Sequence, residues 1–190
     1  MNDKTIGFAF TGSFCTFKKV ITELEILANT GINIVPVMSA NAYSTDTRFG
    51  TAEEFIEKIR KITGNEIIHT IAGAEPIGPK NLLDALIIAP CTGNTLAKLA
   101  NGITDTSVTM AAKATLRNQK PVIIAVSTND GLGGSGKNIG LLHNTKNIYF
   151  VPYGQDDPDK KTNSLVADMS KITETLLSAL RGNQIKEILF

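Results

Sequence analysis

Five short apolar runs recur along the chain and alternate with longer segments of helical pattern. The runs cover residues 5–10, 32–38, 85–90, 121–126 and 148–152. Each run is rich in β-branched or aromatic residues and is apolar on both faces, which is typical of strands that helices cover on two sides. The pattern therefore predicts a sheet of parallel strands.

The segments between the runs predict helices. They span residues 16–30, 51–62, 94–101, 106–118 and 164–181, the last opened by Ser164. Thr51 with Glu54 three residues later is the sequence of a capping box, and Gly31 is placed to end the first helix. Residues 66–71 are predicted as a short extra strand. The β-α alternation predicts one doubly wound, Rossmann-like or flavodoxin-like α/β domain over residues 1–190, with a mainly parallel sheet.

The loops after the predicted strands carry the candidate chemistry, because ligands of a doubly wound sheet bind beyond the carboxyl ends of its strands. Gly, Ser, Thr and Asn dominate the loops at 11–15, 39–50, 91–95 and 127–138. These residues offer backbone and hydroxyl donors to a phosphate or a polar ring. The charged segment 154–164 instead predicts a solvated surface loop.

The charges are nearly balanced, with 19 Lys plus Arg against 18 Asp plus Glu. Such a chain has no long-range field of one sign, so we expect neither nucleic acid nor a membrane surface as a partner. Two cysteines are too few for a disulfide scaffold, and the first apolar run is too short to span a bilayer. These features predict a cytoplasmic protein with reduced thiols.

Gly12 and Ser13 lie between the first predicted strand and the first helix. Free backbone N–H groups and the helix dipole favour a phosphate there, and Gly12 lets the backbone approach it closely. A plain turn with a helix cap explains the same residues equally well. The dinucleotide pattern GxGxxG is absent.

Polar residues also crowd the start of the helix predicted at 94–101, directly after Pro90. The Asn94 amide offers both a donor and an acceptor, which suits a carboxylate or the edge of a heteroaromatic ring. Helix capping by Thr92 or Asn94 is the alternative.

The stretch "NDGLGGSGKN" at 129–138 comes close to a phosphate-binding P-loop. That pattern needs Ser or Thr after Lys137 to ligate magnesium, and the chain has Asn138 instead. A glycine-rich lid over a substrate is therefore the better interpretation, and a nucleoside triphosphatase is the outlier.

Two motifs carry a resemblance to a known family. "TGS" at 11–13 together with "APxTxNTLAKxAxGxxD" at 89–105 resembles the flavoprotein family of FMN-binding cysteine decarboxylases, which includes phosphopantothenoylcysteine decarboxylase. The resemblance covers most of the chain. It implies FMN as the cofactor, with its phosphate held by Gly12, Ser13 and Ser39. The residues implied along the flavin ring and the substrate are Ala89, Pro90, Thr92, Asn94 and Thr95.

The resemblance also implies a homo-oligomer, a trimer or a multiple of one, with flavin between subunits. The decarboxylases place a catalytic His about a dozen residues before the "IAP" of the third strand, and Pro76 stands there in this chain. Proline cannot transfer a proton, so we expect cysteine decarboxylation to be absent. His69 and His143 are interpreted as structural, which leaves the catalytic residues unknown, and no metal site is predicted.

Longer strings, among them "STDTRFG" at 44–50 and "KNIYFVPYGQDDPDKKTNS" at 146–164, are similar to one branch of this family. In that branch the chain is one subunit of a two-subunit oxidoreductase that forms an aromatic dicarboxylate. The resemblance implies a partner subunit that binds NADP or NAD, and a small dicarboxylate substrate. Arg48 and Lys137 are the predicted anchors for its carboxylates. An FMN-dependent decarboxylase and a non-catalytic scaffold for the partner stay open as alternatives.

Overall fold

All five apolar runs form strands in the computed structural model, which describes residues 3–190. The strands are β1 (Thr5–Phe10), β2 (Asn33–Met38), β3 (Ala85–Cys91), β4 (Val122–Thr128) and β5 (Ile148–Phe150). They pair in parallel in the order β2-β1-β3-β4-β5, which is the flavodoxin-like order. The predicted doubly wound α/β fold is confirmed.

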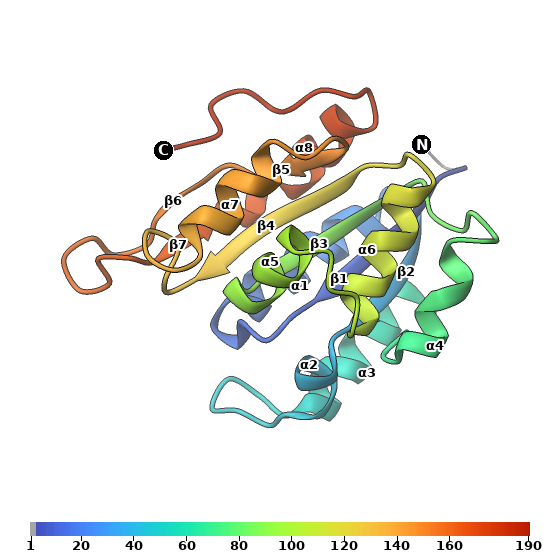
Figure 1. The fold of residues 1–190 in the computed structure, drawn as a ribbon. Coiled ribbons are helices and arrows are strands. Elements are labelled where there is room, and N and C mark those ends of the chain that lie inside the picture. The colour runs from blue at the N-terminus through green and yellow to red at the C-terminus, as the bar shows by residue number, and fades with distance from the viewer. Residues whose placement is uncertain (1–2) are drawn as a thin grey trace.

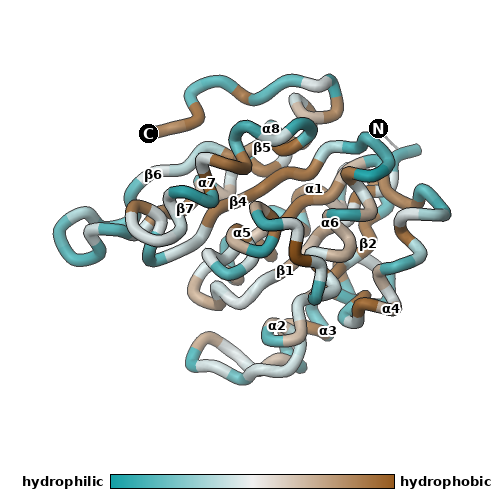
Figure 2. Tube along the Cα trace, viewed as in Figure 1, coloured by the Kyte–Doolittle hydropathy of each residue, from teal (hydrophilic) through white to brown (hydrophobic). Residues whose placement is uncertain are grey.

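Helices cover both faces of this sheet (Figure 1). On one face lie α1 (Phe17–Ala28) and α8 (Ile172–Ala179), with α3 (Ala52–Thr63) beside α1. The other face carries α5 (Gly93–Ala100), α6 (Ser107–Arg117) and α7 (Gly136–His143). Every residue of β3 and β4 is buried, as expected for strands that are covered twice. Figure 2 shows the hydrophobic stretches along these central strands and hydrophilic ones in the outer loops.

The start of α3 and the end of α1 lie where the sequence predicted them. Thr51 Oγ1 accepts a hydrogen bond from the Glu54 backbone N–H at 3.2 Å, and Glu54 Oε2 accepts one from the Thr51 N–H at 2.8 Å. This capping box was predicted. Gly31, with a φ of 81°, follows α1 in the left-handed conformation. Short helices not predicted from the sequence are η1 (Phe14–Thr16), α2 (Ala40–Ser44), α4 (Ile71–Ala74) and η2 (Glu75–Ile77).

The segment after β5 differs from the prediction. Strands β6 (Tyr153–Gln155) and β7 (Leu165–Ala167) form an antiparallel pair, and β7 continues the sheet beside the end of β4. The helix predicted at 164–181 is therefore wrong in its first residues, because helical structure begins only with the 3-10 helix η3 (Met169–Lys171), which leads into α8 at Ile172. Ser164 caps no helix. Its hydroxyl donates to the backbone of β4 at 3.3 Å, so pairing with the sheet prevails over the local helix signal.

The extra strand predicted at 66–71 is also wrong. Only Ile68 makes an isolated bridge, to Val37 of β2. The segment has no room for more, because Thr70 already caps α4, with its hydroxyl accepting from the Gly73 N–H at 3.0 Å.

Both histidines have aromatic partners. The His69 ring stacks on Tyr43 at 3.9 Å, and the His143 ring stacks on Phe150 at the same distance. His143 Nε2 lies 2.8 Å from the Tyr153 hydroxyl oxygen. Burial lowers the pKa of His143.

We expect His143 to make folding stability depend on pH. A pKa below the unfolded value of about 6.5 means that the unfolded chain binds the proton more tightly. The contribution of His143 to the free energy of unfolding is therefore present above about pH 6.5 and is lost as the pH falls through the folded pKa. Urea titrations at several pH values should show a smaller loss on acidification in His143→Gln. Equal losses in parent and variant would contradict this assignment.

Gly140 offers a route to a more stable protein. It lies inside α7, and a Cβ placed there meets nothing within 4 Å. We expect Gly140→Ala to raise the free energy of unfolding by about 0.5–1 kcal/mol, because glycine loses more backbone entropy in a helix. The matched control is Gly64→Ala, equally open but at a φ of 67°, which should lower stability. Denaturant melts of both variants test the pair, and a stabilising Gly64→Ala would contradict the argument.

Candidate functional site

A cleft of about 940 Å³ opens at the carboxyl ends of the parallel strands. Its walls come from the loop after β1, the loop between α2 and α3, the start of α5, the turn after β4 and the loop between β6 and β7. The order of the strands reverses between β1 and β3, where a doubly wound sheet binds its ligands. The cleft lies at this switch point.

The loop after β1 has the features of an anion cradle. Within residues 3–190, the backbone N–H groups of Gly12, Phe14 and Cys15 have no hydrogen-bond partner. A Cβ at Gly12 would meet only the Phe14 ring, at 3.7 Å, so the fold itself does not require glycine there. Ser13 Oγ lies 2.7 Å from Ser127 Oγ, which ties the loop to β4. Unpaired N–H groups at the start of a helix suit a phosphate.

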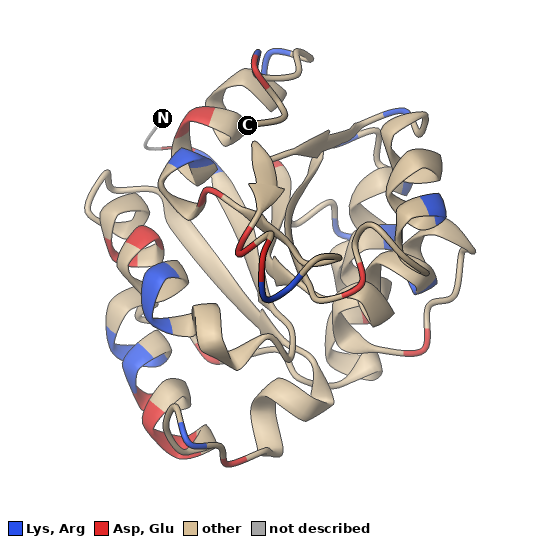
Figure 3. Ribbon diagram, turned by 90° about the vertical axis from the view of Figure 1, so that its left-hand side faces the viewer, with Lys and Arg blue, Asp and Glu red and all other residues tan. Residues whose placement is uncertain are grey.

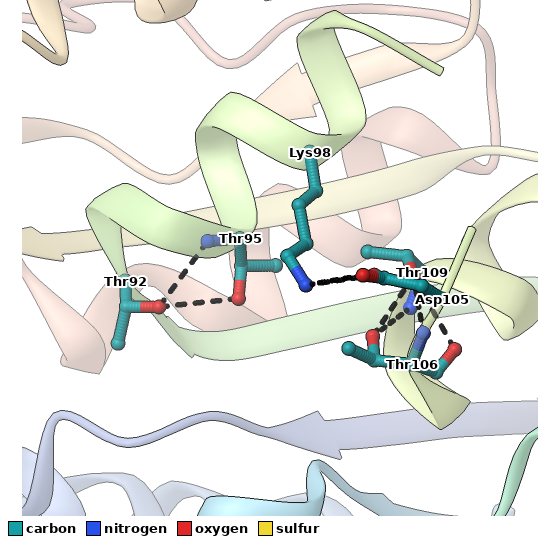
Figure 4. Close-up of polar contacts among 6 residues, drawn as sticks. All are labelled: Thr92, Thr95, Lys98, Asp105, Thr106 and Thr109. Carbon is teal, nitrogen blue, oxygen red and sulfur yellow. Dashed lines mark hydrogen bonds and ion pairs between the residues drawn. The ribbon is translucent and has the colours of Figure 1, made fainter. Parts of the chain in front are cut away.

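At the start of α5, Thr92 caps the helix, whereas Asn94 faces the cleft. Thr92 Oγ1 accepts a hydrogen bond from the Thr95 N–H at 3.4 Å and lies 3.1 Å from Thr95 Oγ1 (Figure 4). Thr92 is thus the helix cap. Asn94 is exposed and lines the cleft, and its side-chain amide has no partner in the described part of the chain. It is free to bind a ligand.

Four other predicted binding residues lie near the cleft but do not line it: Ala89, Pro90 and Thr95 of the "APxTxNT" motif, and Ser39 directly after β2. Ala89 and Pro90 are buried in β3, joined by a cis peptide bond, and the Pro90 carbonyl accepts from a hydroxyl of the β1 loop at 2.7 Å. Thr95 is buried beneath Thr92. The Ser39 hydroxyl caps α2 by accepting from the Ala42 N–H at 3.3 Å.

The rest of the motif fastens α5 to α6. Lys98 Nζ binds Asp105 Oδ1 at 2.7 Å, and Thr106 and Thr109 form a capping box at the start of α6 (Figure 4). The hydrogen bond from Lys98 lowers the pKa of Asp105. These contacts fix the position of α5, the helix that carries Asn94.

The positive charges of the cleft only partly match the prediction. Arg48 lines the cleft, with its guanidinium carbon 4.9 Å from the centre of the Phe49 ring. Lys137 is exposed on α7 and does not line the cleft. Lys161 lines it instead, from the loop between β6 and β7, and forms an ion pair with Asp156. Figure 3 shows Lys and Arg interspersed with Asp and Glu over the whole fold.

The turn after β4 closes around Asp130. The Gly133 and Ser135 backbone N–H groups both donate to the Asp130 carbonyl, at 2.9 and 3.2 Å, and α7 begins at Gly136. In a P-loop such groups would face phosphates. Here they are engaged within the turn, which argues against a nucleoside triphosphate site.

Pro76, which stands where the decarboxylases have a catalytic His, does not line the cleft. It lies in η2, which packs on α6. Within residues 3–190, no group of three or more His, Cys, Asp or Glu side chains is arranged to hold a metal ion. None of the described helices is long and apolar enough to cross a membrane.

Comparisons with known proteins agree with the fold and the motifs. The chain is 50% identical over 189 residues to the B subunit of dipicolinate synthase from Bacillus subtilis, and the match covers 100% of this chain and 94% of that protein. The crystal structure of the dipicolinate synthase B subunit from Bacillus halodurans C superposes with a TM-score of 0.91 at 49% identity, covering 99% of this chain and 96% of that one. HAL3 from Cryptococcus neoformans shares the fold, with a TM-score of 0.68 at 18% identity over 95% and 98% of the two chains. The family described as Flavoprotein matches residues 1–169, and the chain belongs to this family.

Proposed function

We propose that this chain acts as the B subunit of a dipicolinate synthase. With an A subunit it would convert a dihydrodipicolinate-type precursor into dipicolinate, in the mother-cell cytoplasm of a spore-forming bacterium. The observation that carries the proposal is the 50% identity over the whole chain to a protein of that name. NADP or NAD would be bound by the A subunit.

We also propose FMN as the cofactor, which the Flavoprotein family supports. The cradle fits its phosphate, since Gly12 and Ser13 stand beside unpaired N–H groups. Thr92 and Asn94 line the wall where the ring and the substrate would lie. A bound flavin supplies a two-electron acceptor or donor next to the substrate. The chain's own residues bind the phosphate and orient the ligands.

The substrate carboxylates would be held by Arg48 and Lys161. Arg presents a planar fork that matches a carboxylate bidentately, and Lys adds a compact charge. Forming the aromatic ring removes a hydride and a proton from the precursor. A nicotinamide bound by the partner subunit would supply the final two-electron acceptor, and the proton would pass to water in the open cleft. This chain's cleft would hold the ring in place.

Charge removal tests this placement. We expect Arg48→Ala and Lys161→Ala each to weaken dipicolinate binding about ten- to a hundredfold, because each loses a charge-assisted contact of about 1.5–3 kcal/mol. Lys137→Ala is the matched control and should bind as the parent does, since Lys137 lies outside the cleft. Calorimetric titration measures all three. A loss confined to Lys137→Ala would place the dicarboxylate on α7 instead.

Turnover with the purified A subunit tests the function itself. The alternatives give other results: a decarboxylase releases carbon dioxide from a cysteinyl substrate, and a scaffold leaves cleft variants fully active in the complex. The visible spectrum before and after added FMN decides the cofactor. A homo-oligomer, a trimer or a multiple of one, is our expectation for the assembly, and light scattering measures it.

A further inference from the structure

Asp130 is the carboxylate in the cleft that has no cationic partner. The lining holds two acids, Asp130 and Asp156, and two bases, Arg48 and Lys161. Asp156 is paired with Lys161. Asp130 forms no ion pair with any residue in the described range 3–190. A negative charge thus stands unneutralised in a cleft that otherwise suits anions.

The two oxygens of this carboxylate differ. Oδ1 accepts hydrogen bonds from Thr128 Oγ1 and, at 2.8 Å, from Ser135 Oγ. These bonds hold the pKa of Asp130 below its usual range, so the group is ionised near neutral pH. The nearby backbone N–H groups of Asp130 and Ser135 also lower this pKa. Within residues 3–190 no donor forms a hydrogen bond of good geometry to Oδ2. An ionised carboxylate with one free oxygen is a strong acceptor for a ligand donor.

The position of Asp130 is fixed against α5. A Cβ added at Gly93, the first residue of α5, would lie 2.9 Å from Asp130 Oδ1 and 2.7 Å from the oxygens of Thr128 and Ser135. The carboxylate therefore packs against the helix start, next to the exposed Asn94. Its charge is favourable at this end of the helix dipole.

We propose that Asp130 is a specificity-determining residue that accepts a hydrogen bond from an N–H or O–H group of the ligand. This inference rests on the proposed function. The carboxylates of the ligand would face Arg48 and Lys161, and its donor would face Asp130. A reduced ring whose nitrogen bears hydrogen, or that carries a hydroxyl, offers such a donor. The aromatic product has only a lone pair on nitrogen, so Asp130 favours the precursor and promotes release of dipicolinate.

Two ligands of equal charge and similar shape test the proposal. Pyrrole-2,5-dicarboxylate carries a ring N–H between its carboxylates, and furan-2,5-dicarboxylate carries a ring oxygen there. We expect the parent to bind the pyrrole at least about tenfold more tightly than the furan. In Asp130→Asn, the amide oxygen keeps the bonds from Thr128 and Ser135, and the amide nitrogen replaces the free oxygen. The preference should then disappear or reverse.

Asp156→Asn is the matched control. It removes the same charge from the cleft but no acceptor that we assign to the ligand, so both affinities should change together and their ratio should stay. Equal binding of both ligands by the parent, or an unchanged ratio in Asp130→Asn, would overturn this inference alone. A parent that binds neither of these ligands nor dipicolinate overturns the proposed placement of the dicarboxylate in this cleft as well. The ratio for the parent is decisive even where the variant does not fold.

Discussion

Ser13→Asp is expected to abolish FMN binding and to leave the fold intact. Ser13 stands in the proposed cradle, half-buried, with its hydroxyl 2.7 Å from Ser127 Oγ. A carboxylate there would face the phosphate at about 4 Å, where like charges near a protein surface repel by about 4 kcal/mol. We therefore expect affinity to fall by at least about a hundredfold. Quenching of FMN fluorescence on titration measures this.

The matched control is Ser13→Ala. It removes the hydroxyl without adding charge, so affinity should fall only several-fold, by the loss of about 1 kcal/mol. Circular dichroism should match the parent in both variants. If Ser13→Asp binds FMN as tightly as the parent, the phosphate lies elsewhere and the cradle assignment is wrong.

The strands of the sheet could be predicted because their environment is simple. Strands β1 to β4 have six or seven residues each and come from runs that are apolar on both faces, and β3 and β4 are buried throughout. The short β5 could be predicted because the apolar run that contains it continues to residue 152. The predicted cap at Thr51 is equally local, since a few adjacent residues form it. Such elements depend on little outside their own segments.

Strands β6 and β7 could not be predicted for the opposite reason. Each has three residues, and β7 owes its conformation to pairing with Ser127 and Thr128 of β4, nearly forty residues earlier. The loop that they enclose is charged and mostly exposed, and its composition alone indicates solvent. The same long-range pairing brings Lys161 to the cleft, whereas Lys137, predicted from a glycine-rich pattern, lies on the outside of a helix.

In the cleft, too, local features could be predicted from the sequence and long-range ones could not. Its loops could be located from the sequence because they follow the strands of a doubly wound sheet. Only the three-dimensional structure shows that Thr92 caps α5 and that Asn94 does not, since by sequence either residue could be the cap. Asp130 gave no sequence signal beyond its place in a turn. Its importance comes from the two hydroxyl groups and the helix start that surround it.

The contact between α5 and the Asp130 turn leads to the last prediction, Gly93→Ala. The added methyl carbon would stand 2.7 Å from Ser135 Oγ and from Thr128 Oγ1, closer than such atoms approach. Thr128 belongs to a buried strand, so the turn and α5 must move apart. We expect the free energy of unfolding to fall by about 1–3 kcal/mol, the cost of overpacking a tight contact.

Function should suffer more than stability in Gly93→Ala. The shift displaces Asp130 and Asn94 together, and a displacement of about 1 Å near reacting groups can reduce turnover about a hundredfold. Turnover in the complex with the A subunit measures the effect. Gly133→Ala is the matched control, because its Cβ would meet the same turn at an ordinary 3.5 Å, so it should stay near the parent in both measurements. Parent-like turnover in Gly93→Ala would mean that the proposed reaction does not depend on how the Asp130 turn packs against α5.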